Sequence, residues 1–284
     1  MFRFSIITAL TLLLSAPAGL ALTGLDLQLV SEQTAVVPGK PFTVGLWIDH
    51  DRGWHTYWRF PGIVGVPTQL TWTLPPGWKA GPLVYPEPER TLMFQVKAQG
   101  FDRDVMLRTE ITPPANVQPG TQITLMAKAV WMCCGKSCHP GTTDLSITLP
   151  VAETAAVNPK WKRLLDAERA RAERTSTAWS SSVTESGSLL TLTLKPVSAQ
   201  ARVTEDQREA SEIIVFTEDG WFDSDKPQLI TRQADGSLTI QLIKAETYLG
   251  GRLPKNLRCI LRCEKGWEQG QSWRCLQISP RIVR

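Results

Sequence analysis

The six cysteines are the residues of this sequence whose chemistry can be judged most directly. Thiols that form and open disulfides carry electrons in pairs, and thiolates also bind metal ions, so redox exchange, structural bonding and metal binding are the chemistries to weigh. An odd number of cysteines in each half of the chain leaves at least one thiol per half without a local partner. The two groups are Cys133, Cys134 and Cys138, and Cys259, Cys263 and Cys275.

The first group lies in the segment WMCCGKSCHP, residues 131–140. In an extended chain the Cα atoms of Cys134 and Cys138 would lie about 13 Å apart, whereas a disulfide needs roughly 4.4 to 6.8 Å. The turn-like residues 135–137 can fold the chain back and bring the two together at the tip or edge of a hairpin. A bond between the adjacent Cys133 and Cys134 would be strained. The residues therefore favour a disulfide between Cys134 and Cys138.

Lys136 and His139 flank this pair, and positive charge favours the thiolate that attacks another disulfide. The same spacing is also common in purely structural disulfides of exported proteins. A copper or zinc site is a third hypothesis. Ligands adjacent in sequence fit tetrahedral zinc poorly, so we predict no bound metal. The residues alone do not decide between redox exchange, a structural disulfide and a metal site. The candidate metal ligands are Cys133, Cys134, Cys138 and His139.

The second group is predicted to contain a structural bond. Cys259 and Cys263 lie on one face of a predicted strand, residues 257–263, and cannot reach each other while the chain is extended. Residues 273–278 are predicted to form the return strand, which carries Cys275. We therefore expect a structural disulfide between Cys263 and Cys275, with the thiol of Cys259 buried.

The N-terminus predicts the compartment. Residues 1–21 combine a short basic start, an apolar run and small residues at a cleavage site after Ala21, as in a secretory signal peptide. The apolar run is shorter than the ~20 residues that span a bilayer, so we expect a mature chain that does not span the membrane. We therefore expect export to the periplasm. Because the periplasm is an oxidising environment, this location favours redox roles for the cysteines. A net charge of +4, without a block of basic residues, argues against a nucleic-acid partner.

Strict alternation of apolar and polar residues recurs through the first half of the chain. Period two over short runs predicts half-buried strands, and Pro/Gly turn signals separate the runs at intervals typical of an all-β sandwich. Residues 22–150 are thus predicted to form one sandwich domain. The alternating runs are 25–29, 42–48, 70–74, 123–131 and 145–149.

The pattern changes after the predicted sandwich. Asn158-Pro159 is a typical helix start, and apolar residues follow at helical spacing to about Arg174, so residues 151–179 are expected to form a helical linker. The Ser/Thr-rich residues 175–188 are interpreted as a linker or exposed loop. Alternation then returns, which predicts a second, smaller β domain over residues 180–284.

Several motifs, ordered along the chain, resemble the periplasmic N-terminal domain of the thiol:disulfide interchange protein DsbD. The closer resemblance is to the variant found in ScsB-type copper-tolerance reductases. It covers roughly residues 25–150, while residues 180–284 resemble the second β domain of ScsB-type proteins more loosely. The motifs are GWHTYWRFPG (53–62), PTQLTWTLPPGW (67–78), YPEPER (85–90), ITPP (111–114) and Trp131-x-x-Cys134-x-x-x-Cys138-x-Pro140-Gly141.

The resemblance implies an immunoglobulin-like sandwich whose cysteine pair shuttles electrons. In such proteins a membrane-embedded module or its thioredoxin-like domain reduces the pair, which then reduces exported partners. Cys134 and Cys138 match the redox pair. Cys138, followed by x-Pro140, matches the cysteine that forms the mixed disulfide, and Trp131 belongs to the same motif.

The resemblance also implies an aromatic surrounding for the pair. His55 and Tyr57 match the region where the family places aromatic side chains beside the cysteines, and Phe94 in residues 93–95 is the candidate for the family's cap loop. Cys133 departs from the pattern as an extra thiol.

The resulting hypothesis is an exported thiol:disulfide interchange protein with thioredoxin-like partners. Thiol exchange needs a thiolate, an accessible sulfur and a docking surface, so no cofactor and no acid/base triad are expected. The sequence ends at Arg284 without the membrane helices of full-length relatives, so a separate membrane electron donor is expected. The alternatives are a non-catalytic binding or scaffold domain with a structural disulfide, and a copper- or zinc-binding protein.

Overall fold

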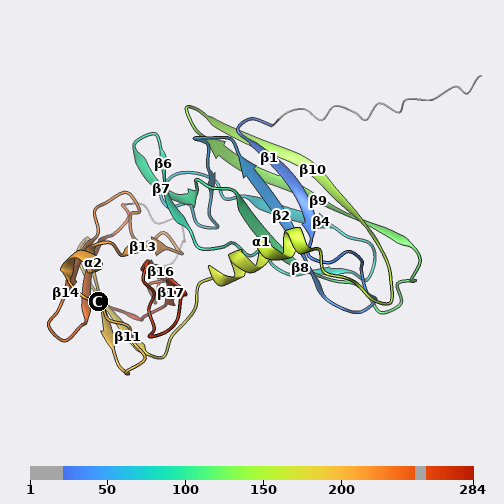
Figure 1. The fold of residues 1–284 in the computed structure, drawn as a ribbon. Helices are drawn as coiled ribbons and strands as arrows, with labels where there is room; N and C mark the ends of the chain where they lie inside the picture. The colour runs from blue at the N-terminus through green and yellow to red at the C-terminus, as the bar shows by residue number, and fades with distance from the viewer. Residues whose placement is uncertain (1–21, 247–253) are drawn as a thin grey trace, which may run out of the picture.

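The structure, a computed structural model, describes residues 22–246 and 254–284. The predicted signal peptide, residues 1–21, lies outside the described residues. The chain folds as an all-β protein, with an immunoglobulin-like sandwich followed by a smaller β domain and a connecting helix between them (Figure 1). The predicted fold class is therefore confirmed. Within the described ranges, no helix is long and apolar enough to cross a membrane.

Two antiparallel sheets form the sandwich, and their facing sides enclose its core. Each alternating run predicted from the sequence lies in one of their strands to within one residue, because every second side chain faces the core. The first sheet has the order β1-β2-β8-β5, and the second has the order β10-β9-β4. The strands are β1 (Leu25–Ser31), β2 (Phe42–His50), β8 (Val105–Thr112), β5 (Lys79–Ala80), β10 (Cys138–Pro150), β9 (Gln122–Cys134) and β4 (Gln69–Thr73).

A small third sheet, with the order β3-β7-β6, lies at the end of the sandwich where β9 turns into β10 (Figure 1). It consists of β3 (Thr56–Tyr57), β7 (Val96–Phe101) and β6 (Glu89–Met93). Strands β6 and β7 form a tight hairpin, residues 89–101, which we call the cap hairpin.

The connecting helix α1 (Pro159–Ala170) begins where the sequence predicts, with Asn158 at the N-cap and Pro159 in the first turn. It ends at Ala170, before the predicted end near Arg174. Its Glu168 is buried and accepts a hydrogen bond from Arg103 Nη1 at 2.6 Å, so the helix is tied to the sandwich.

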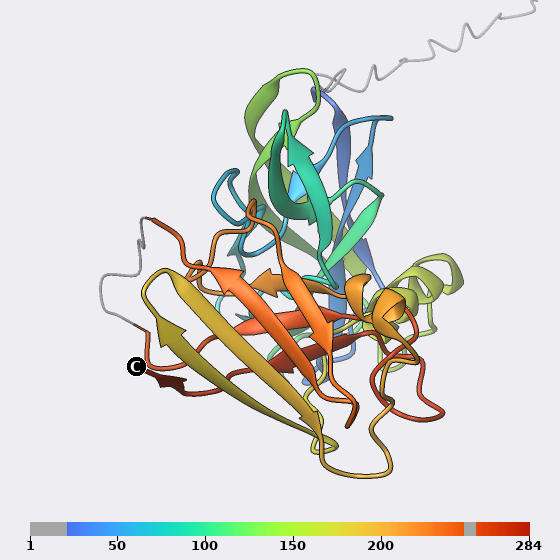
Figure 2. The same cartoon turned by 90° about the vertical axis from the view of Figure 1, so that its left-hand side faces the viewer.

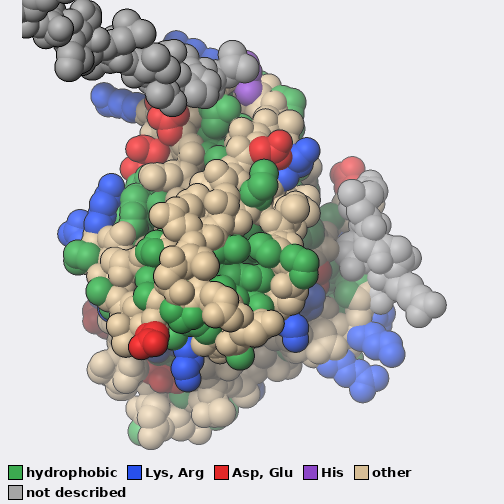
Figure 3. Space-filling model, turned by 90° about the vertical axis from the view of Figure 1, so that its right-hand side faces the viewer, with side chains coloured by type: hydrophobic (Ala, Val, Ile, Leu, Met, Phe, Trp, Pro, Cys, Tyr) green, Lys and Arg blue, Asp and Glu red, His purple; other side chains and the backbone are tan. Residues whose placement is uncertain are grey.

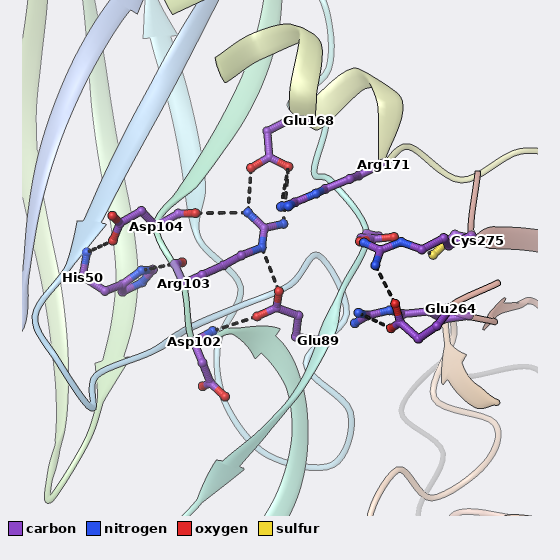
Figure 4. A network of polar contacts seen from close by, with 12 residues as sticks. His50, Glu89, Asp102, Arg103, Asp104, Glu168, Arg171, Glu264 and Cys275 are labelled. Atoms are coloured by element: carbon purple, nitrogen blue, oxygen red, sulfur yellow. Dashed lines mark hydrogen bonds and ion pairs between the residues drawn. The ribbon is translucent and has the colours of Figure 1, made fainter. Parts of the chain in front are cut away.

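Arg103 makes this connection as part of a wider network. Its Nε lies 2.7 Å from Glu89 Oε1, so one guanidinium lies between a carboxylate of the cap hairpin and that of Glu168 on α1 (Figure 4). Because Glu168 is buried and Glu89 is only partly exposed, solvent screens the ion pairs less than it would on the open surface.

The second domain has two sheets (Figure 2). One has the order β14-β15-β12-β11-β18, and the other has the order β13-β16-β17. The strands are β11 (Trp179–Ser186), β12 (Leu189–Pro196), β13 (Ile214–Thr217), β14 (Leu229–Arg232), β15 (Leu238–Ile243), β16 (Cys259–Arg262), β17 (Cys275–Ile278) and β18 (Ile282–Val283). A short helix, α2 (Gln207–Ser211), was not predicted from the sequence.

The interpretation of residues 175–188 as a linker or exposed loop is wrong. Most of this segment is strand β11, in which Trp179 and Val183 are buried and the residues between them are Ser-rich. The Ser/Thr content obscures the strand because these side chains occupy its solvent-facing side.

The predicted disulfide between Cys263 and Cys275 is also wrong, since both thiols are free. Cys275 pairs with Arg262 across β16 and β17, so its side chain lies on the same sheet face as that of Ile260. Cys263 and Cys259 belong to the opposite face, because side chains alternate along the strand. Cys259 is a buried thiol, as predicted.

The face of the β13-β16-β17 sheet that carries Cys275 packs directly against the sandwich. Phe216, Ile260 and Cys275 belong to the same buried apolar cluster as the sandwich core. At this contact the Cys275 thiol donates to Glu87 Oε2 at 3.2 Å, and the guanidinium of Arg274 pairs with the same carboxylate. One face of the second domain therefore extends the sandwich core, with a buried ionic contact at its edge, while the second domain also has a core of its own.

The face of the molecule shown in Figure 3 carries hydrophobic side chains scattered across its middle, with acidic and basic side chains mixed around them. On the described part of this face, neither sign of charge forms a continuous patch.

We predict that Glu87→Ala lowers the free energy of unfolding by about 3 kcal/mol, because the buried Cys275 thiol loses its acceptor and Arg274 loses its buried partner. Urea unfolding measures this change. Glu264→Ala is the matched control: Glu264 also pairs with Arg274 but its side chain is 54% exposed, so its loss should cost much less. Equal effects of the two substitutions would contradict the assignment of Glu87 as the buried partner.

Candidate redox site

The candidate site lies at the tip of the β9–β10 hairpin. Cys134 ends β9 and Cys138 begins β10, and the strand register places them directly opposite each other. Their Cα atoms are 4.2 Å apart, and the predicted disulfide joins them. The Gly135 amide donates to the Ser137 carbonyl at 3.0 Å, which closes the turn between the cysteines.

Cys133 faces away from this disulfide. Side chains alternate along β9, so Trp131 and Cys133 enter the sandwich core while Cys134 lies on the other face. The Cys133 thiol donates to the Gly24 carbonyl at 3.6 Å. Burial, followed by the charge of Asp51, raises the pKa of Cys133 to about 12, so its thiol is protonated at neutral pH.

The two aromatic residues inferred from the family resemblance lie at the disulfide. The backbone of His55 exchanges two hydrogen bonds with that of Cys134, at 2.9 and 3.0 Å. The Tyr57 hydroxyl donates to Cys134 Sγ at 3.1 Å, and His55 Nε2 lies 3.3 Å from the same hydroxyl. Burial raises the pKa of Tyr57 to about 12 and lowers that of His55, so both side chains are neutral near pH 7.

The two sulfurs of the disulfide have unequal exposure. Cys134 is 1% exposed, whereas Cys138 is only partly buried. An attacking thiolate can therefore reach Cys138 more easily than Cys134. The apolar cluster around the pair consists of Tyr57, Ala98, Val64, Met93 and Met132.

The cap hairpin lies beside the tip of the β9–β10 hairpin (Figure 1). Phe94, the candidate cap residue, occupies its turn with a left-handed φ of 57° and is 65% exposed. Its neighbour Met93 instead packs against the cluster that includes Cys134 and Cys138. The hairpin is thus next to the disulfide, and Met93 supplies the apolar contact.

The other candidate residues of the site have different surroundings. Lys136 is exposed, and His139 Nε2 lies 2.7 Å from Ser137 Oγ. Pro140 is exposed and lies opposite Met132 in the hairpin. Trp131 is not brought to the disulfide, because it lies on the core face of β9.

Trp54 was not singled out from the sequence as part of the site. Its ring packs against that of His139 in a tilted arrangement, with ring centres 5.5 Å apart. A Cβ atom on Gly135 would lie 3.0 Å from the Trp54 ring, so the hairpin turn approaches this ring too closely for a larger residue. The adjacent Gly53-Trp54 in the first family motif was the available signal.

The four candidate metal ligands do not converge. Cys133 lies on the opposite face of β9 from Cys134, which is itself bonded to Cys138. Throughout residues 22–246 and 254–284, no group of three or more His, Cys, Asp or Glu side chains is placed to hold a metal ion.

An immunoglobulin-like sandwich with a disulfide of unequally exposed sulfurs at a hairpin tip is the arrangement that the resemblance to thiol:disulfide interchange domains implies. Residues 26–150 match the family model described as "Thiol:disulfide interchange protein DsbD, N-terminal", which confirms the predicted resemblance of this segment. A comparison with curated proteins gave no match.

Comparison with solved structures supports the fold. The N-terminal periplasmic domain of ScsB from Proteus mirabilis superposes with a TM-score of 0.61 at 19% identity, covering 94% of this chain and 96% of that one. The pilin subunit BcpA of Bacillus cereus matches with a TM-score of only 0.27 at 10% identity, over 91% of this chain and 68% of the pilin, and adds nothing to the assignment.

We predict that, after mild reduction at pH 7, iodoacetamide labels Cys138 roughly ten-fold faster than Cys134, because thiol reactivity follows exposure and thiolate character. Peptide mass spectrometry over a time course measures the two rates. Cys133 serves as an internal control and should stay unlabelled while the protein is folded. Faster labelling of Cys134 than of Cys138 would contradict the proposed order of access.

Proposed function

We propose that this protein exchanges disulfides with exported thioredoxin-like proteins through Cys134 and Cys138. The observation that carries the proposal is the asymmetry of the pair: Cys138 is partly exposed, whereas Cys134 is buried and accepts a hydrogen bond from Tyr57. Such a pair offers one sulfur for attack and one stabilised leaving group.

Reduction of the pair begins when a donor thiolate attacks Cys138 Sγ. The Cys134–Cys138 bond breaks, a mixed disulfide forms at Cys138, and Cys134 leaves as a thiolate. Because the Tyr57 hydroxyl already donates to this sulfur, it stabilises the developing negative charge. The second thiolate of the donor then attacks the donor sulfur that is bonded to Cys138 in the mixed disulfide. This releases Cys138, and the donor leaves oxidised by two electrons.

The reduced pair passes the same two electrons to a partner. The Cys138 thiolate attacks the partner disulfide and releases one partner thiolate, which takes a proton from solvent. The Cys134 thiolate then attacks Cys138 Sγ in the mixed disulfide, re-forms the original bond and releases the second partner thiol. Lys136, exposed in the intervening turn, favours the thiolate of Cys138 by its charge. No step requires a cofactor.

The setting of this reaction is part of the proposal. We place the mature chain in the periplasm after cleavage of residues 1–21, with a separate membrane protein as electron donor. Residues 22–150 would be the exchange domain, 151–179 the helical linker and 180–284 the second domain. The resemblance to ScsB-type reductases extends the proposal to copper tolerance, in which exported proteins with oxidised thiols would be the partners.

Cys134→Ala should trap a partner on Cys138 as a mixed disulfide, since the thiol that resolves this intermediate is gone. Non-reducing gels followed by mass spectrometry of a periplasmic extract detect the trapped species. Cys133→Ala is the control, because it keeps the pair intact and should trap nothing. A purely structural disulfide predicts no thioredoxin-like protein on Cys138 in the first variant, and that result would overturn the proposed function.

Tyr57→Phe should slow reduction of the Cys134–Cys138 disulfide roughly ten-fold, because the leaving sulfur loses a hydrogen bond that strengthens as its charge develops. Stopped-flow kinetics with a reduced thioredoxin-like protein measure the rate. His55→Ala is a useful comparison: it removes the neighbouring ring but leaves the hydroxyl on Cys134, and should have the smaller effect. An unchanged rate for Tyr57→Phe would remove Tyr57 from the mechanism.

A further inference from the structure

We infer that the second β domain holds the cover of the redox site in place through residues 217–228 and thereby limits access to the disulfide. The inference rests on the proposed function, because it assigns the second domain a positioning role in that exchange. The segment joins β13 to β14 and reaches the cap hairpin (Figure 2).

Strand β7 of the cap hairpin lies between the second domain and the redox site. Ala98 packs in the cluster with Tyr57 and Cys134. The residues on either side of it, Lys97 and Gln99, bond to the second domain. Because neighbouring side chains alternate between faces, one face of β7 covers the disulfide while the other is available for this contact.

Gln99 makes the innermost of these contacts and is only 3% exposed. Its Nε2 donates to the Thr217 carbonyl at 2.8 Å, and its Oε1 accepts from the Thr217 amide at 2.7 Å. The same Nε2 donates to the Phe60 carbonyl at 2.6 Å. One buried amide therefore joins the cap hairpin, the second domain and the start of the loop over residues 60–66.

Asp225 and Ser224 add further contacts from the second domain. The Lys97 amide donates to Asp225 Oδ1 at 2.9 Å, and Ser224 Oγ donates to the Lys97 carbonyl at 3.2 Å. Ser224 Oγ also accepts from the Ile63 amide at 3.2 Å. A Cβ atom on Gly62 would lie 2.2 Å from this hydroxyl oxygen, so the approach depends on glycine.

The loop over residues 60–66 is the second part of the cover. A Cβ atom on Gly65 would lie 2.3 Å from the Tyr57 ring, which shows how closely this loop lies on the tyrosine that bonds Cys134. Val64 of the same loop joins the apolar cluster around the disulfide. Ser224 thus bonds both parts of the cover, the loop and the cap hairpin.

The physical consequence concerns access. Movement of the cap hairpin away from the disulfide requires the loss of these hydrogen bonds, so their removal raises the population of open states. Each hydrogen bond lost should raise that population roughly five-fold.

The test is the rate at which reduced glutathione opens the Cys134–Cys138 disulfide in the full chain. The combined substitution Ser224→Ala and Asp225→Ala removes two hydrogen bonds to Lys97 of the cap hairpin and should raise this rate roughly 25-fold. Asp225→Asn keeps an acceptor oxygen for the Lys97 amide and should leave the rate near that of the unaltered protein. Lys226→Ala, at an exposed neighbouring position, is the matched control and should have no effect.

Hydrogen exchange separates opening of the cover from unfolding. In the combined variant, amides of β7 should exchange faster while those of β12 and β15 keep their protection, and Asp225→Ala alone should give the same pattern more weakly. An unchanged glutathione rate in folded variants overturns the inference. Because glutathione needs no protein partner, this result is distinct from failure of the proposed function, which would appear as no exchange between the unaltered protein and thioredoxin-like proteins.

Discussion

The antiparallel register of β9 and β10 places Cys134 directly opposite Cys138, and the other features of the redox site depend on this pairing. A shift of one residue would exchange the two faces of the strand. Cys133 would then leave the sandwich core and Cys134 would enter it. The buried residues of β9 that precede Cys133 oppose such a shift, since each would lose its place in the core. The hydrophobic pattern of the whole hairpin therefore positions a disulfide at its tip.

The same pairing creates two different environments for the two sulfurs. Cys134 lies beneath Tyr57 and is bonded through its backbone to His55, whereas Cys138 lies at the accessible side of the tip. Thiol exchange requires both an accessible electrophilic sulfur and a leaving sulfur whose charge is stabilised. In the proposed exchange, Cys138 provides the accessible sulfur, and Cys134 with the Tyr57 hydroxyl provides the leaving sulfur.

The second domain packs against the sandwich and contributes to the surroundings of the disulfide. Phe216, Ile260 and Cys275 complete the sandwich core, and Glu87 accepts hydrogen bonds from the second domain at the border. Such a contact couples the stability of the two domains. It also places residues 217–228 against the strand that covers the disulfide, so the exposure of the redox site depends on both domains.

Much of this organisation was determined by the sequence alone. Period-two alternation predicted the strands of the sandwich, Asn158-Pro159 predicted the start of α1, and the spacing of Cys134 and Cys138 around a turn predicted their disulfide. These features are local, because each depends on residues close together in the chain. The family motifs added the aromatic residues beside the pair.

Only the tertiary structure decided the features that depend on which strands meet and in which register. The Cys263–Cys275 bond could not be excluded from spacing, because the face of β17 that carries Cys275 is set by its pairing with β16. The exposure of Phe94 and the contacts of Gln99 with Thr217 likewise depend on segments far apart in sequence. Periodicity specifies which side chains share a face, but the partner of that face is chosen only when the whole chain packs.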